Sequence, residues 1–481
     1  MLASSLVLIA TALALSPSPM PAGVADAVYL NGSFYTLDER QPRAEAVAIR
    51  DGRFLRVGRS AEVRGLIGPA TRVVDLHGSF VLPGLIDAHT HPSLEARFPY
   101  RPWDGFPWTW LKSRAHRFEL PALPSSRVRA LADAARIMSS YGFTAFGDGY
   151  VPAAQLPAWE ELIRRGELRQ HAVLFMPVVV PGAAPLPARR LAEEFGRYRL
   201  PGLRLGAKLF VDGYLESESA YLTEPYAGRA DARGSLATPA ATLDALVDEL
   251  DRAGLPLQLH AIGDGGVHAA LDAVAKAVAG RAGRPGPVHA IVHARLVRED
   301  DLPRLVELGV ALVPDVFLAQ PSPVDLIAAK IGSRRREERY LALKRLWDAG
   351  ALVGVGSDWA SASMDPYYGM YVGVTRRAPH HPERGAMGEG NGVALERMIR
   401  SYTLNNARIL GLAGETGSIE AGKSADFAVL DRDILRRPIE ELLETRVLAT
   451  IFEGRVVHDG RPLPPGLARS EEELLEIGHA H

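Results

Sequence analysis

The chain of 481 residues contains no cysteine. Disulfides and thiolate ligands are therefore excluded, and any bound metal must use nitrogen and oxygen donors. An excess of one charge is also missing, since 55 Lys and Arg residues stand against 57 Asp and Glu residues. Nucleic-acid binding usually leaves a strong basic excess, so this balance argues against a nucleic-acid partner. The one dense basic cluster, Arg334 to Arg339, is interrupted by two glutamates and is typical of a solvated helix face, with an anion site as the alternative.

Only a short apolar run marks the N-terminus, Leu6 to Leu15. A membrane-spanning helix needs about 20 such residues. Small residues and prolines follow, so residues 1–25 resemble a secretory signal peptide, although no Lys or Arg precedes the run. We expect export to the periplasm or medium, with no stable membrane association after cleavage. The alternatives are an N-terminal membrane tether, or a cytoplasmic protein whose start site is misassigned.

Strand-like segments with tight-turn signals occupy both ends of the chain. Asn31-Gly32, Asp51-Gly52 and Glu453-Gly454 lie between apolar runs and predict hairpin turns. The runs themselves are Ala27–Leu37, Ala44–Gly58, Val73–Leu82, Ala425–Leu430 and Val447–His458. We therefore predict one small β-sandwich domain assembled from residues 26–80 and 415–465, with the middle of the chain inserted into it and residues 466–481 as a tail.

The middle of the chain, residues 81–414, alternates strand-like and helix-like segments, which favours βα units and a parallel sheet. Amphipathic helical patterns cover segments such as Pro239–Ala253 and Gly266–Ala279. The strand candidates are Leu82–Asp87, Phe143–Gly147, His171–Val180, Leu203–Phe210, Leu257–His260, Ala290–His293, Ala311–Pro314 and Leu352–Gly356. About eight such strands fit a (β/α)8 barrel best.

Polar groups fall where these predicted strands end, which is where a (β/α)8 barrel carries its functional side chains. Two histidines two residues apart share one face of an extended segment, and a lysine inside an apolar strand is costly unless partnered. Taken singly, a strand-end histidine is more often structural and a Ser-Asp pair often caps a helix. Taken together, six groups predict a metal site: His89, His91, Lys208, His260, His293 and Asp358.

The motifs around these residues resemble the amidohydrolase superfamily. Leu82-Pro-Gly-Leu-Ile-Asp-Ala-His-Thr-His-Pro92 is similar to its opening motif. The segments beginning at Lys208, His260 and His293 and ending at Asp358 look like the amidohydrolase-3 branch, which includes N-substituted formamide deformylase-like proteins. Tyr402-Thr-Leu-Asn-Asn-Ala407 and Gly417 to Phe427 match late signatures, so the resemblance runs from about Ala27 to Gly460.

The resemblance implies a two-metal centre. His89, His91 and Asp358 would bind the first metal, and His260 and His293 the second. Lys208, carboxylated on its amine, would bridge the two as an anionic ligand. Nitrogen and oxygen donors favour zinc, while manganese, cobalt or iron would also fit. A water with a lowered pKa would attack, and Asp358 would move its proton to the leaving amine.

The chain departs from the branch at two places. Val292-His293-Ala294 stands where Glu-His-Ala is usual, which removes a carboxylate expected beside His293. Pro314-Asp-Val-Phe317 stands where Gln-Pro-X-His is common, so a substrate-side histidine is absent. Asp315 in this segment is a candidate for substrate contact, with different work as the alternative.

Weaker substrate-side candidates lie close to the predicted ligands. Asp212 and Asp264 follow ligand-bearing strands and serve either substrate contact or turn chemistry. Tyr214 and Trp103 lie in loops, where they would line an apolar pocket or pack in a lid. Asp87 is a candidate to orient one imidazole or to make a structural hydrogen bond.

We predict hydrolysis of a C–N bond in a small amide-like substrate. The same metal core would also support deamination of a heterocyclic amidine, and ester hydrolysis stays open. A binding barrel that has lost activity is the alternative from another class, although the six retained ligands argue against it. Association into a homo-oligomer is left open.

Overall fold

The computed structural model describes residues 23–95, 124–179, 185–321, 326–359, 362–379 and 381–462. Most of the predicted signal peptide, Trp103 and the predicted tail lie outside these ranges. Among the described helices, none combines the length and hydropathy that crossing a membrane requires.

Eight parallel strands form the central sheet, in the order β15-β14-β13-β12-β11-β10-β9-β8. Each strand pairs with the next one along the chain, as right-handed βα units require. The strands are β8 (Leu85–Thr90), β9 (Phe143–Asp148), β10 (His171–Pro177), β11 (Leu203–Phe210), β12 (Leu257–Ala261), β13 (Ala290–His293), β14 (Ala311–Pro314) and β15 (Leu352–Val353).

The first and last strands meet and close the barrel. β15 has only two residues, but the extended segment after it continues alongside β8. Ala88 N donates to Val355 O at 3.1 Å, and Asp358 N donates to His89 O at 2.9 Å. His91 N donates to Trp359 O at 2.7 Å. The closure therefore lies at the place where two predicted ligand segments run side by side.

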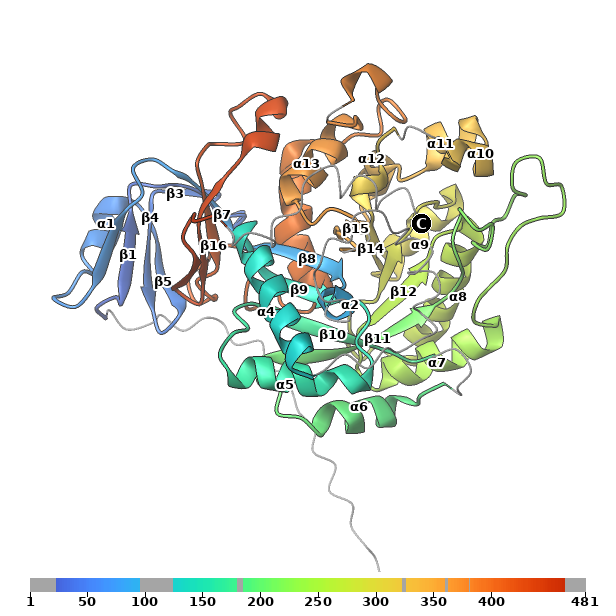
Figure 1. Ribbon diagram of the computed structural model, residues 1–481, viewed down its shortest axis with the longest axis horizontal. Helices are drawn as coiled ribbons and strands as arrows, with labels where there is room; N and C mark the ends of the chain where they lie inside the picture. The colour runs from blue at the N-terminus through green and yellow to red at the C-terminus, as the bar shows by residue number, and fades with distance from the viewer. Residues whose placement is uncertain are drawn as a thin grey trace, which may run out of the picture.

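Helices that follow the strands pack around the barrel (Figure 1). α7 buries Leu243, Leu246, Val247 and Leu250, whose spacing of three and four residues defines one helical face. The barrel helices are α4 (Pro124–Ser140), α5 (Leu156–Arg164), α6 (Ala188–Gly196), α7 (Ala240–Arg252), α8 (Asp264–Gly280), α9 (Leu302–Glu307) and α12 (Leu343–Asp348). Further helices are α1 (Ser60–Arg64), α2 (Pro92–Glu95), α10 (Leu326–Ile331), α11 (Ser333–Arg339), α13 (Pro366–Thr375), α14 (Leu395–Arg400) and α15 (Asn406–Ile409), with a π turn at Ser401–Asn405. Short 3₁₀ turns cover Ala153–Gln155, Glu299–Asp301, Val316–Leu318, Pro382–Arg384 and Ile439–Glu444.

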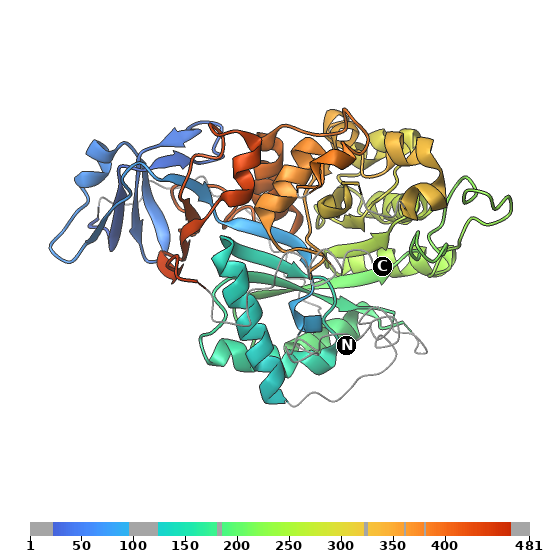
Figure 2. The ribbon, with the colours of Figure 1, turned by 45° about the horizontal axis from the view of Figure 1, so that its top comes forward.

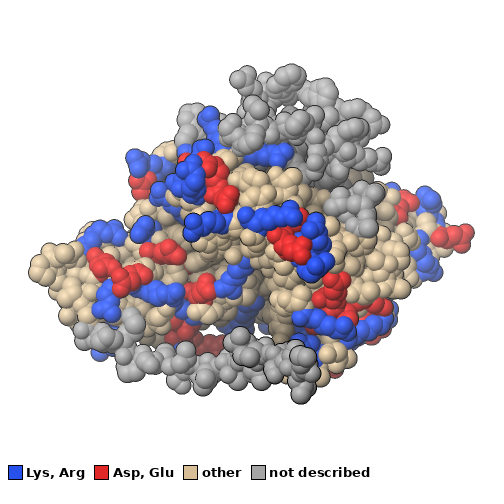
Figure 3. Space-filling view, turned by 90° about the horizontal axis from the view of Figure 1, so that it is seen from below, with Lys and Arg blue, Asp and Glu red and all other residues tan. Residues whose placement is uncertain are grey.

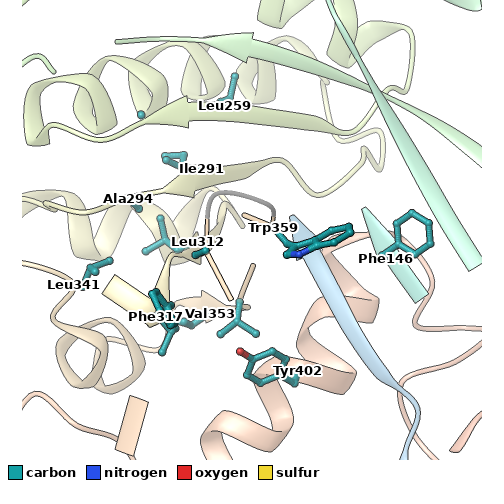
Figure 4. Packing of buried hydrophobic residues seen from close by; sticks show 14 of the residues in the cluster. Phe146, Leu259, Ile291, Ala294, Leu312, Phe317, Leu341, Val353, Trp359 and Tyr402 are labelled. Carbon is teal, nitrogen blue, oxygen red and sulfur yellow. The ribbon is translucent and has the colours of Figure 1, made fainter. Parts of the chain in front are cut away.

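Neighbouring strands contribute side chains in register to the core between sheet and helices. Leu259, Ile291, Leu312 and Val353 pair in sequence across β12 to β15 and are buried (Figure 4). Because side chains alternate along a strand, Gln258 and His260 project from the opposite face of β12, toward the barrel interior.

Strands from both ends of the chain build two further sheets beside the barrel (Figure 2). One sheet contains β1 (Ala27–Leu30), β4 (Ala46–Arg50), β5 (Arg53–Gly58) and β6 (Arg72–Asp75). The other contains β2 (Ser33–Tyr35), β3 (Arg43–Ala44), β7 (Phe80–Pro83), β16 (Phe427–Leu430), β17 (Val447–Phe452) and β18 (Arg455–His458). Phe427 lies between the sheets, with its ring centroid 5.1 Å from that of Tyr29 and 6.0 Å from that of Phe54. The limits predicted for this composite domain stay predictions.

Two of the local predictions, one hairpin turn and one continuous strand, are wrong. Asn31-Gly32 does not turn a hairpin, because β1 and β2 belong to different sheets and the chain crosses between them there. The predicted strand Leu82–Asp87 is divided after Pro83, so that β7 pairs with β16 and β8 begins the barrel. Gly84 sits at the division, where a Cβ atom would lie 2.0 Å from Oγ1 of Thr144. The hairpins at Asp51-Gly52 and Glu453-Gly454 form as expected.

The basic cluster is largely not a solvated face. Arg334 points to solvent, but the side chains of Arg335 and Arg339 are only 11% and 19% exposed. Arg335 donates to Pro225 O at 2.6 Å, and Arg339 donates to Asp264 at 3.0 Å. The cluster thus ties α11 to the loop after β11 and to the first residue of α8. On the face drawn in Figure 3, basic and acidic side chains are interspersed rather than segregated by sign.

The barrel and the terminal sandwich are joined by a buried ion pair. His171 Nε2 at the start of β10 lies 3.0 Å from Oδ2 of Asp426, and the His171 ring lies 4.8 Å from that of Phe452. Burial lowers the pKa of His171, but the hydrogen bond and charge of Asp426 outweigh it and raise the pKa above its ordinary value. The pair is therefore formed in full below the ordinary histidine pKa and is lost as pH rises through the folded-state pKa.

We expect His171→Ala to destabilise the protein more at pH 6 than at pH 8.5. The pH-dependent part should be about 1.5 kcal/mol, as for a hydrogen bond to a charged group. Thermal or urea unfolding of both proteins across this pH range measures it. A stability difference that does not change with pH would show that the pair contributes only packing.

Candidate metal centre

The six side chains singled out in the sequence are all buried or nearly so at the carboxyl end of the barrel strands. His91 Nε2 lies 2.9 Å from Oδ1 of Asp358, and His89 Nε2 lies 3.4 Å from the same oxygen. Ring centroids of His89 and His293 are 5.1 Å apart, and those of His293 and His260 are 4.5 Å apart. One ligand atom each from His89, His293 and Asp358 falls within 4.8 Å of the others.

Lys208 belongs to the same cluster. It lies on β11, in register with Gln258 of β12, and is 2% exposed. Burial lowers the pKa of its amine to about 7, against the charges of Asp358 and Asp315, which raise it. At neutral pH much of this lysine is therefore uncharged, which removes part of the cost of burying it.

Asp87 holds the two ligand segments together through the backbone. Its Oδ1 accepts hydrogen bonds from the N–H groups of His89 and Ser357, both at 3.1 Å. Of the two roles predicted for Asp87, the structural hydrogen bond is the one observed.

The backbone is also unusual at two of the predicted ligands. Asp358 and His293 adopt φ angles of 51° and 73°, which are unusual for residues other than glycine.

Hydrogen bonding fixes the tautomer of His89. Nε2 of Gln258 donates to Ala88 O at 2.7 Å, so Oε1 is the atom that faces Nδ1 of His89 at 2.6 Å and must accept its proton. Burial and the nearby charge of Lys208 lower the pKa of His89 to about 3, so the ring is neutral at neutral pH. Its Nε2 then carries a bare lone pair, which is buried and has no hydrogen-bond partner.

The same reasoning applies to the other two histidines. Nδ1 of His293 lies 2.9 Å from Oδ1 of Asp315, so Nε2 is the nitrogen left to carry the lone pair. Nε2 of His260 lies 3.4 Å from Gly213 O, so Nδ1 carries the lone pair of that ring. Burial is the main cause that lowers the pKa of both histidines well below the ordinary value.

A cation fits this donor set. Burial raises the pKa of Asp358, but its contacts with His89 and His91 and the charge of His91 outweigh burial and hold the pKa well below its ordinary range. Neutral His89 turns the buried lone pair of Nε2, which has no hydrogen-bond partner, toward Oδ1 of Asp358 at 3.4 Å. Such a contact is unfavourable unless a positive charge lies between the two atoms.

The weaker candidates for substrate contact differ in whether their side chains are already hydrogen-bonded within the protein. Asp212 accepts backbone N–H groups of Tyr221, Ile262 and Gly263, each at 2.9 Å, which favours turn chemistry over substrate contact. Asp264 is likewise occupied, by Thr223 and Arg339.

Tyr214 and Asp315 have different surroundings. Tyr214 is 40% exposed, and its ring meets His260 edge-on at 5.1 Å, as a substrate-facing side chain would. Asp315 is 2% exposed and bonds His293 and Arg295 rather than facing open space. Trp103 lies outside the described residues.

Sequence reasoning missed Gln258, Arg295 and Glu216. Gln258 stands two residues before His260 on the same face of β12, so the strand period could have pointed to it. Arg295 and Glu216 lie in loops, where no periodic signal exists, and meet only in the folded chain, at 2.7 Å.

The parallel barrel and its buried cluster of nitrogen and oxygen donors define the class, a metal-binding (β/α)8 barrel. Residues 104–458 match the model of a family described as "Amidohydrolase family". The chain belongs to the amidohydrolase family.

Three similar proteins agree with this assignment. An N-substituted formamide deformylase of Arthrobacter pascens is 25% identical over 89% of this chain and 97% of its own. An imidazolonepropionase of Kosmotoga olearia is 26% identical over 85% of this chain and 90% of its own. The crystal structure of an uncharacterized metal-dependent hydrolase from Pyrococcus furiosus matches with a TM-score of 0.70 at 21% identity, over 85% of this chain and all of that one.

These findings confirm the predicted family, the fold class and the enzyme class, a hydrolase acting on carbon–nitrogen bonds other than peptide bonds. The role of each site residue stays a prediction.

Gly149, one residue after β9, leaves room for the two imidazoles. A Cβ atom at this position would lie 2.2 Å from Cε1 of His89 and 2.9 Å from Cε1 of His91. We expect Gly149→Ala to displace both rings and to lower the bound metal, measured by elemental analysis, by at least half. Gly196→Ala, where a Cβ meets nothing within 4 Å, is the control. Unchanged metal content in Gly149→Ala would argue against these rings as ligands.

Proposed function

We propose that the protein hydrolyses an amide-like C–N bond of a small, uncharged molecule with water activated at a two-cation centre. His89, His91 and Asp358 would hold one cation, and His260 and His293 the other. Zinc suits this set of imidazole and carboxylate donors, and manganese, cobalt or iron is also compatible with it.

One observation carries the proposal. Nε2 of neutral His89 is buried, has no hydrogen-bond partner and faces Oδ1 of Asp358 at 3.4 Å. A divalent cation is the partner that this nitrogen lacks, and Oδ1 of Asp358, which also lies 2.9 Å from Nε2 of His91, would share the cation with it.

The side chains supply the proton transfer. When bound, the cations lower the pKa of a water molecule and polarise the carbonyl carbon that it attacks. Asp358 accepts the proton that the water releases and delivers it to the leaving nitrogen as the C–N bond breaks. The products are a carboxylic acid and an amine. Asp358 suits both roles because it is ionised and its side chain is 18% exposed, while His89 beside it is 1% exposed.

Lys208 would act as an N-carboxylated ligand shared by both cations. Carboxylation needs a neutral amine that attacks carbon dioxide, and burial lowers the pKa of Lys208 to about 7. A C–N bond forms to carbon dioxide and the nitrogen loses one proton, so the product would be a carbamate anion with two oxygen atoms, which suits a position between two cations.

Aromatic side chains support a substrate with an apolar group. Phe210 and Tyr214 lie 5.2 Å and 5.1 Å from the ring of His260, from β11 and the loop after it. Tyr150 extends this aromatic group, with its ring centroid 6.2 Å from that of Phe210. The named relatives act on an N-substituted formamide and, by name, on an imidazolone, and small amides of this kind fit the proposal.

The N-terminal segment supports export, which we propose as the location of the enzyme. The proposal rests on the apolar run Leu6–Leu15 and the small residues after it. It implies that the substrate is met outside the cytoplasm.

The test is reconstitution of metal-depleted protein with zinc, followed by assays on N-substituted formamides, cyclic amides, heterocyclic amidines and esters. We expect zinc to restore hydrolysis of an amide, and Asp358→Asn to lower kcat by about 10³-fold, as for loss of a general acid–base group. Turnover of amidines alone would replace the proposal with deamination. Tight zinc binding without any turnover would favour an inactive binding barrel.

A further inference from the structure

We propose that Asp315 is a positioning residue, which orients His293 toward the second cation and is itself held by Arg295 and Glu216. The inference rests on the proposed two-cation centre. It gives Asp315 a place behind a ligand, in contrast to the substrate contact that its position in the sequence suggested.

Asp315 grips His293 with both oxygens. Oδ1 and Oδ2 lie 2.9 Å and 3.0 Å from Nδ1 of the imidazole. Because β13 and β14 are paired with His293 opposite Pro314, Asp315 comes directly after β14, one residue past the position opposite the ligand. The carboxylate therefore fixes both the tautomer and the plane of the ring, and Nε2 is left to face the cluster.

A second charge holds the carboxylate in place. Nε of Arg295 donates to Oδ2 of Asp315 at 3.2 Å, and Nη1 of the same guanidinium donates to Oε1 of Glu216 at 2.7 Å. The Arg295 side chain is 4% exposed, so this ion pair is formed away from water. The chain of contacts from His293 to Glu216 thus links β13, the end of β14 and the loop after β11.

The same loop carries Tyr214, two residues before Glu216. A displacement of that loop would move Arg295, and through it Asp315 and then His293.

The same contacts also compensate for one departure of the sequence from the family pattern. Val292 stands where the resemblance predicts a carboxylate next to His293, and Asp315 supplies a carboxylate to that histidine from the next strand.

A similar His–Asp–Arg group lies away from the cluster. Asp301 contacts Nδ1 of His268 with its two oxygens at 2.8 Å and 3.1 Å, and Arg304 donates to Asp301 at 2.9 Å and also lies 3.0 Å from Nδ1 of His268. This His–Asp–Arg group lies on α8, the 3₁₀ turn before α9, and α9 itself. Asp301→Asn therefore removes the same charge from the same kind of contact without touching a predicted ligand.

The experiment is a zinc titration of metal-depleted wild type, Asp315→Asn and Asp301→Asn, followed by calorimetry or with a competing chelating dye. We expect wild type to bind two equivalents. Asp315→Asn should bind the first with unchanged affinity and the second 10–100-fold more weakly, the usual cost of losing a partner behind a metal ligand. Asp301→Asn should bind both as wild type does.

Equal affinities for both equivalents in Asp315→Asn and wild type would overturn the proposal, as would the same loss in Asp301→Asn. If Asp315→Asn does not fold, Asp315→Glu keeps the charge beside Arg295 but moves the oxygens by one methylene. Weaker binding of the second equivalent alone is again expected, and wild-type affinity would overturn the inference. A wild type that takes up fewer than two equivalents would overturn the two-cation centre and this inference together.

Discussion

Nε2 of His89 is buried, has no hydrogen-bond partner and faces Oδ1 of Asp358 at 3.4 Å, and two side chains keep these atoms in that position. Gln258 holds the proton of His89 on the far side of the ring, and Asp87 ties the backbones of both segments together. Burial keeps the imidazole neutral, and the contacts of Asp358 with the neighbouring histidines outweigh its own burial and hold its pKa well below the ordinary range. Without a cation this contact destabilises the folded protein, and with a cation it contributes to metal affinity. The same atoms therefore affect both stability and function.

The closure of the barrel explains why these atoms meet. β8 and β15 are the ends of the sheet, and a chain that closes the sheet must bring residues near 89 and 358 together. The remaining donors come from β11, β12 and β13, whose carboxyl ends lie around the same opening. Behind them, polar side chains from other segments bond the rings: Gln258 of β12 bonds His89 of β8 across the barrel, and Asp315, directly after β14, bonds His293 of the adjacent strand β13.

Much of this could be predicted from the sequence, and for physical reasons. Barrel strands buried on both faces read as apolar runs, so the bounds of β11, β13 and β14 are those expected, and strand-end polar groups stand out against them. Pairing between distant segments could not be predicted, so the Asn31-Gly32 turn signal predicts a hairpin although this dipeptide joins two sheets. For the same reason the sequence did not indicate Arg295 and Glu216, which meet only after folding. Asp212 and Asp264 could each be assigned to substrate contact or to turn formation from the sequence, and only their hydrogen bonds in the structure distinguish the two roles.

The account depends on two cations lying among six side chains. Anomalous diffraction at the zinc edge from zinc-loaded crystals tests this most directly. The account predicts two peaks, one between His89, His91 and Asp358 and one beside His260 and His293, with density for a carboxyl group on Nζ of Lys208. A single peak away from these residues, or an Asp358 that still contacts both histidines directly with no peak beside it, would contradict the account.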